Sequence, residues 1–67
     1  MLDANIVGSR LRSLRGDTPQ AIVAAACGIS ISALGMYETG KRIPRDEIKL
    51  RLARYYNTNI EALFYAS

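Results

Sequence analysis

The stretch QAIVAAACGISISALGMYETG, residues 20–40, decides the predicted fold of this chain. Two short helix-forming segments flank a turn at residues 28–30, where Gly28 can end one helix and Ser30 can cap the next. Two helices joined by so short a turn are typical of a helix-turn-helix unit, although the same spacing occurs in other all-α proteins. We therefore predict such a unit over about residues 19–39.

Further helices are expected on both sides of this unit. Apolar residues at helical spacing, together with capping residues, mark where each helix begins and ends. No strand pattern with hairpin turns is visible in the sequence. We predict an all-α, compact five-helix bundle, formed as a single domain over residues 1–67. The five predicted helices cover residues 5–15, 19–27, 31–39, 46–56 and 60–65.

Several details of these helices are specific expectations. Thr18 is expected to cap the second helix, with Pro19 as its first residue, where no N–H is needed. Asn59 is expected to cap the fifth helix. In the first helix, Ile6, Leu11 and Leu14 lie close to one face at helical spacing, which predicts that this face is the apolar one.

Composition limits the function of the chain. Nine Lys and Arg against six Asp and Glu give a net charge of +3, which weakly favours a nucleic-acid partner. With one cysteine and no histidine, the chain offers neither an internal disulfide nor a zinc site. We expect no cofactor and no enzymatic activity, because paired carboxylates and a phosphate-binding glycine loop are also missing. No membrane or secretion signal is recognisable, so a cytoplasmic location is expected.

The chain resembles the Cro/C1-type (XRE-like) helix-turn-helix domains of phage and bacterial regulators. The resemblance covers nearly the whole chain, from Ile6 to Phe64, and it implies a lambda-repressor-like DNA-binding fold. It rests on residues 8–15, 20–24 and 28–30, on Leu34, Glu38, Gly40, Lys41 and Pro44, and on residues 59–64.

The resemblance also implies a site. The helix at residues 30–39 would enter the major groove of an operator as the recognition helix of a repressor-like regulator. Arg15 and Glu38 match a structural ion pair of the family. The residues that would face bases are Ile31, Ser32, Ala33, Gly35 and Met36. The residues that would hold the DNA backbone are Gln20, Ser30, Lys41, Arg42 and Arg45.

Two alternatives remain beside this interpretation. Ile31 and Met36 offer bases only apolar contacts, most readily to thymine methyl groups, so the fold could instead serve as a protein-interaction module. The second alternative is an antitoxin-like protein that binds both DNA and a protein partner. A homodimer on the operator is expected, with residues 63–65 as the first candidate for its interface. The basic residues Arg10, Arg12, Lys49, Arg51 and Arg54 are expected to be mainly solvated.

Overall fold

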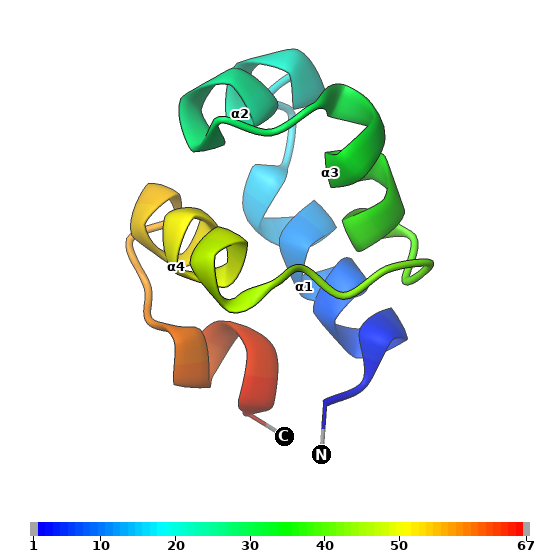
Figure 1. The fold of residues 1–67 in the computed structure, drawn as a ribbon, viewed down its shortest axis with the longest axis vertical. Coiled ribbons are helices and arrows are strands. Elements are labelled where there is room, and N and C mark those ends of the chain that lie inside the picture. The colour runs from blue at the N-terminus through cyan, green and yellow to red at the C-terminus, as the bar shows by residue number, and fades with distance from the viewer. Residues whose placement is uncertain (1, 67) are drawn as a thin grey trace.

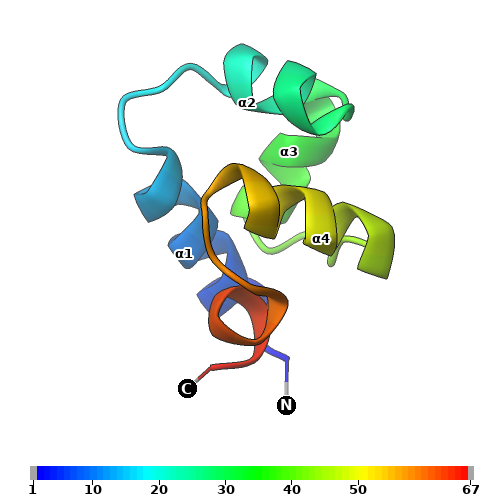
Figure 2. The same ribbon diagram turned by 90° about the vertical axis from the view of Figure 1, so that its left-hand side faces the viewer.

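A computed structural model describes residues 2–66, in which five helical segments follow one another without a strand (Figure 1). The predicted all-α fold with five helices is confirmed. The pair α2 and α3 forms one end of the molecule, and the first and last described residues lie near each other at the opposite end (Figures 1 and 2). The segments are α1 (Ala4–Arg15), α2 (Gln20–Cys27), α3 (Ile31–Glu38), α4 (Asp46–Tyr55) and η1 (Glu61–Tyr65), a single wide turn of π-helix.

Side-chain caps set the beginnings of three helical segments. The Ser30 hydroxyl accepts from the Ala33 amide at 2.9 Å, as predicted for the start of α3. The Asn59 side chain likewise accepts from the Ala62 amide at 2.8 Å. The start of α1 was not predicted correctly, because Asp3 caps it and the helix begins at Ala4.

The predicted start of α2 is wrong by one residue. Pro19 has a ψ of 142°, which is extended rather than helical, so α2 begins at Gln20. The side chain of Thr18 makes no cap there. The Pro19 carbonyl accepts from the amides of Ile22 at 3.1 Å and Val23 at 3.5 Å. The amides of the first two residues of α2 have no intrahelical acceptor, as at any helix start.

One hydrophobic core joins all five segments. It contains Val7, Leu11, Val23, Ala24, Cys27, Leu34, Tyr37, Ile48, Leu52, Ala53, Leu63 and Phe64. Of the three residues predicted to share the apolar face of α1, Leu11 is buried as expected, whereas the prediction is wrong for Ile6 and Leu14, which are 50% and 46% exposed. The buried stripe of α1 is formed by Val7, Gly8 and Leu11. Ile6 and Leu14 border that stripe and line a groove between α1 and η1.

Gly8 allows α1 to cross directly against the C-terminal end of α3. A Cβ atom at this position would lie 2.5 Å from the Glu38 carbonyl oxygen and 2.8 Å from that of Tyr37. Both neighbours are backbone atoms, which rotation of a side chain does not move aside. The crossing therefore requires a residue without a side chain, and it fixes α3 on its scaffold.

The turn between α2 and α3 bends the chain sharply. Gly28 adopts the left-handed conformation with a φ of 67°, and its amide donates to the Ala25 carbonyl at 3.2 Å. The two helix axes are bent by 107° relative to each other, within the range usual for helix-turn-helix units.

Within residues 2–66 no single helix has the length and apolarity to span a membrane; only the bent pair α2 and α3, taken together, meets those two criteria.

The C-terminal segment is held by cations that were expected to be solvated. Arg10 donates from α1 to the carbonyl of Leu63 at 3.2 Å and to that of Ala66. Lys49 is buried, and its ammonium group donates to the Tyr65 hydroxyl at 2.9 Å. The expectation for Arg10 and Lys49 is therefore wrong, because the end of η1 supplies them with acceptors.

Tyr56 carries a buried hydroxyl that has no hydrogen-bond partner among the described residues. Burial raises the pKa of this phenol from its ordinary value of 10.0 to about 12. The folded state thus favours the neutral form, and stability should be lost as the pH rises above 10.

We expect Tyr56→Phe to remove part of this alkaline loss. At pH 7 the substitution should leave the free energy of unfolding unchanged or raise it by up to about 1 kcal/mol, because it deletes an unpaired polar group. Urea denaturation at pH 7 and pH 11 measures both effects. Tyr55→Phe, on the more exposed neighbouring ring, is the matched control and should leave the alkaline loss in place. Identical pH profiles for Tyr56→Phe and the parent would contradict this assignment.

Candidate nucleic-acid interface

The exposed side of α3 carries most of the predicted base-facing residues. Ile31 is 52% exposed and Met36 is 36% exposed, and Ser32 is exposed beside them. Ala33 and Gly35 are half-buried. The opposite side of the same helix is buried and consists of Leu34, Tyr37 and Glu38. Helix α3 is therefore anchored on one side and offers a small, mostly apolar surface on the other.

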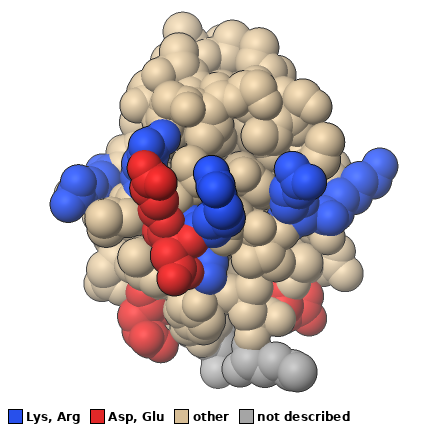
Figure 3. All heavy atoms as spheres, in the orientation of Figure 1, with Lys and Arg blue, Asp and Glu red and all other residues tan. Residues whose placement is uncertain are grey.

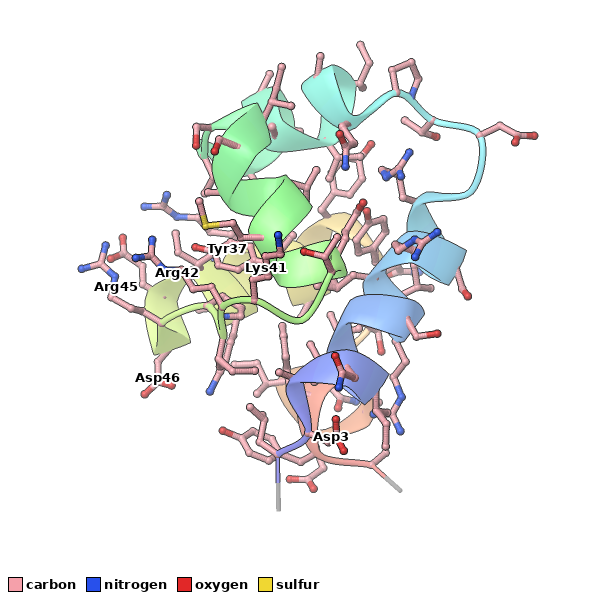
Figure 4. All side chains as sticks on the ribbon, turned by 90° about the vertical axis from the view of Figure 1, so that its right-hand side faces the viewer. Asp3, Tyr37, Lys41, Arg42, Arg45 and Asp46 are labelled. Carbon is pink, nitrogen blue, oxygen red and sulfur yellow. The ribbon has the colours of Figure 1, made fainter. Side chains whose placement is uncertain are left out.

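A basic loop follows this helix directly. Lys41, Arg42 and Arg45 are exposed, whereas Pro44 is buried and anchors the loop to the body. Figure 4 shows Lys41 beside the end of α3, and Arg42 and Arg45 extending together away from the body. Arg42 and Arg45 also border a shallow hollow with Tyr37. Three cations thus lie along one edge of the α3 surface.

The exposed sides of α2 and α3 carry no charged side chains. The only charged residue of α2 and α3 is Glu38, and it is buried. On the face shown in Figure 3 the upper part has no charged side chains, and Lys and Arg side chains cross the middle together with Asp and Glu side chains. The exposed side of α3 is therefore uncharged, and the loop that follows it carries Lys41, Arg42 and Arg45.

Ser30 and Gln20 lie at the starts of α3 and α2. The Ser30 hydroxyl already accepts a hydrogen bond from the Ala33 amide, so its own hydrogen remains available to a phosphate oxygen. The Gln20 side chain donates from Nε2 to Glu38 Oε1 at 2.9 Å. Gln20 keeps a second amide hydrogen beside the free backbone amides of α2, where an anion is favoured.

The predicted pairing of Arg15 with Glu38 is present in the structure. Arg15 Nε lies 2.7 Å from Glu38 Oε2, and Arg15 Nη2 lies 3.1 Å from Oε1. The hydrogen bond to Glu38 raises the pKa of the Arg15 guanidinium. Arg15 also donates to the Thr18 carbonyl at 2.9 Å, so the pair additionally holds the connection into α2.

Sequence reasoning missed that Gln20 joins this pair. Glu38 accepts from one residue of α1 and one residue of α2 while lying on α3, so one carboxylate links three helices. Separations of 18 and 23 residues carry no periodic signal, because they depend on how the helices pack. The predicted phosphate contact of Gln20 is therefore tied to the scaffold through Glu38.

Two other expectations about surface residues are corrected by the structure. Leu63 and Phe64 are buried in the core, so of the proposed dimer surface at residues 63–65 only Tyr65 is exposed. Arg51 is not simply solvated, because it contacts Glu47 at 2.5 Å and the Cys27 carbonyl at 3.4 Å. It thereby supports the C-terminal end of α2, where a cation is favourable.

A sharply bent helix pair, held on a helical scaffold with one side of its second helix exposed, defines a helix-turn-helix domain. The family model described as a helix-turn-helix domain matches residues 6–63. The chain belongs to this family, and its resemblance to Cro/C1-type (XRE-like) domains is confirmed. It is a helix-turn-helix domain and not an enzyme.

Solved structures agree with this assignment. The restriction-modification controller protein C.AhdI from Aeromonas hydrophila is 31% identical, with a TM-score of 0.83 over 92% of this chain and 97% of that chain. The P22 c2 repressor, solved with a synthetic operator, is 23% identical, with a TM-score of 0.87 over 92% of this chain and 97% of that one. The SOS-response transcriptional repressor LexA from Eubacterium rectale is 25% identical, with a TM-score of 0.87 over 97% and 71% of the two chains. Among curated proteins, by contrast, no sequence matches this chain.

Proposed function

We propose that this domain is a sequence-specific double-stranded DNA-binding regulator of transcription that acts in the cytoplasm. The observation that carries the proposal is the exposed side of α3, which is edged by Lys41, Arg42 and Arg45. The major groove, about 12 Å wide, admits one helix. The P22 c2 repressor, which has the same fold, was solved with its synthetic operator.

In the proposed complex, one set of residues contacts bases and another set contacts phosphates. Exposed residues of α3 approach base edges, whereas the cations of the following loop hold phosphates on its flank. Gln20 and Ser30 add hydrogen-bond donors at two helix starts, where the helix dipole also favours a phosphate. Because α3 itself brings no cation, the electrostatic part of the affinity comes from its surroundings.

We expect Arg45→Ala to weaken binding to many duplex sequences by a similar factor. The affinity of the parent should fall with the logarithm of salt concentration, with a slope of about −0.9 per phosphate neutralised. Loss of one contact should make this slope less steep by about 0.9. Fluorescence anisotropy with a labelled duplex at several salt concentrations measures the slope.

The matched control for this measurement is Arg54→Ala, which removes the same charge from an exposed position in the last turn of α4. It should leave the slope within about 0.3 of the parent, since it removes no phosphate contact. Equal slopes for Arg45→Ala and the parent would contradict the assignment of Arg45 to the DNA backbone.

A homodimer on the operator is part of the proposal. One module of this size contacts few base pairs, and two modules about 34 Å apart would read two half-sites on one face of the duplex. Analytical ultracentrifugation with a bound duplex should give two protein chains per operator. A single chain per duplex at saturation would remove the dimer from the proposal and leave DNA binding intact.

A protein-interaction role, including an antitoxin-like one, is the second candidate. The exposed isoleucines favour it, because Ile22 on α2 is 55% exposed and Ile31 on α3 is 52% exposed. Selection from a random duplex library separates the candidates. Enrichment of one sequence supports the regulator, and failure to enrich any sequence at low salt supports an interaction module.

A further inference from the structure

Gly35 leaves a gap in the exposed side of α3. Glycine inside a helix lowers stability relative to alanine, and it is tolerated where another backbone or a ligand approaches closely. At Gly8 the neighbouring backbone approaches closely, but at Gly35 a Cβ atom would meet nothing within 4 Å. No contact within the described residues therefore requires a glycine at this position. A molecule that approaches α3 from outside would provide such a contact.

Two of the exposed neighbours of this gap are apolar, and a third is Ser32, three residues before Gly35. Ile31 lies one helical turn before Gly35 on the same side of α3, and Met36 follows it directly; both side chains are exposed. The Thr39 hydroxyl donates to the Gly35 carbonyl at 2.9 Å, and it lies 3.4 Å from that of Met36. The backbone exposed at the gap thus has its carbonyl groups already engaged. The gap suits a small apolar group better than a polar one.

The side chains present on α3 limit which group of a base the gap can receive. Side chains that read purines through bidentate hydrogen bonds are Arg, Lys, Asn and Gln, and α3 contains none of them. Ser32 is its only exposed polar side chain. In the major groove, the apolar feature that distinguishes the four base pairs is the 5-methyl group of thymine.

We infer that the gap at Gly35, between Ile31 and Met36, receives the 5-methyl group of a thymine in the bound half-site. This inference rests on the proposed function, because it assumes that α3 enters the major groove. The methyl group would lie over the open space at Gly35, on the side of α3 where Ile31 and Met36 are exposed. The bound sequence is then selected at that position mainly by shape and apolar contact.

The experiment starts from the duplex that is enriched by selection. Each thymine in turn is replaced by deoxyuridine, which removes only the 5-methyl group and keeps base pairing. At one position of each half-site, binding by the parent should weaken about fourfold, the effect of burying one such carbon group. Because 5-methylcytosine carries the same group, duplexes with cytosine and with 5-methylcytosine at that position are compared, and the methylated one should bind about fourfold more tightly.

Three variants locate the effect on the protein. Gly35→Ala fills the gap with its own methyl group, so its preference for thymine over deoxyuridine should fall from about fourfold to about onefold. Its melting temperature should rise, which excludes loss of folding as the cause. Ile31→Ala should reduce the preference as well. Ile22→Ala, which truncates an equally exposed isoleucine on α2, is the matched control and should keep the preference of the parent.

Each outcome decides the inference. If the parent binds its selected duplex but no deoxyuridine replacement changes affinity by as much as twofold, the thymine assignment is wrong and the proposed function stands. If a methyl effect is found only with 5-methylcytosine, thymine is the wrong source of the methyl group. If Gly35→Ala keeps the full preference, the methyl group is read elsewhere. If no duplex is enriched, the proposed function and this inference fail together.

Discussion

Gly8→Ala is expected to lower the free energy of unfolding by about 2–3 kcal/mol, as overpacking of a close contact does. The added methyl group would overlap the Tyr37 and Glu38 carbonyl groups, so α1 and α3 have to separate. For a domain of this size the melting temperature should fall by about 10–20 °C. Thermal and urea denaturation followed by circular dichroism measure this loss.

The matched control for Gly8→Ala is the same substitution at Gly35, which also lies inside a helix. Open space at Gly35 means that only the helix propensity changes, so Gly35→Ala should raise the free energy of unfolding by about 1 kcal/mol. The same change from glycine to alanine should therefore lower the free energy of unfolding at position 8 and raise it at position 35. A Gly8→Ala variant as stable as the parent would show that α1 and α3 do not meet at this position.

Glu38→Ala is the second substitution with a large expected effect. It removes the acceptor shared by Arg15 and Gln20 and leaves both donors, which lie between helices, without their partner. Removing one member of a buried pair typically costs about 3–5 kcal/mol, and we expect about 3 kcal/mol, since the Arg15 side chain retains some access to water. Urea denaturation at pH 7 measures the loss.

Glu47→Ala is the matched control for Glu38→Ala. Glu47 is exposed and pairs with Arg51 within α4, so its loss should cost less than about 1 kcal/mol. Glu38→Gln keeps the volume of the side chain and one acceptor oxygen, so its stability should lie between those of the parent and Glu38→Ala. Equal stabilities for Glu38→Ala and Glu47→Ala would contradict the assignment of Glu38 as the carboxylate that links α1, α2 and α3.

These two sites connect the scaffold with the proposed interface. Gly8 and Glu38 meet where α1 crosses α3, and Glu38 also holds the Gln20 side chain at the start of α2. The position of α3 relative to the phosphate-binding groups therefore depends on contacts behind the helix. Variants at Gly8 or Glu38 should weaken DNA binding through misplacement of α3, whereas variants at Arg45 should leave stability unchanged.

Local signals in the sequence predicted the order of the helices well. The cap at Ser30 and the glycine at residue 28 identify the bent pair, because each acts within a few residues of its own position. The same local rules placed Asn59 at the start of the last segment. They were off by one residue at Pro19, because its backbone is extended and not helical.

Features that depend on packing between distant segments were not predictable in this way. Ile6 and Leu14 have helical spacing, yet they border the buried stripe and do not belong to it. The bonds from Arg10 to the end of η1 and from Gln20 to Glu38 join residues far apart in the chain. The resemblance to Cro/C1-type domains supplied the pairing of Arg15 with Glu38, which periodicity alone does not reveal.

The most direct test of the central claim is an NMR titration of the ¹⁵N-labelled domain with its selected duplex. The largest amide shifts are expected at the start of α3, around Ile31 and Ser32, and in the loop over residues 41–45. The amides at the start of α2 should shift as well, and those of η1 should change little. Shifts confined to the groove between α1 and η1, with α3 unchanged, would contradict the claim that α3 enters the major groove.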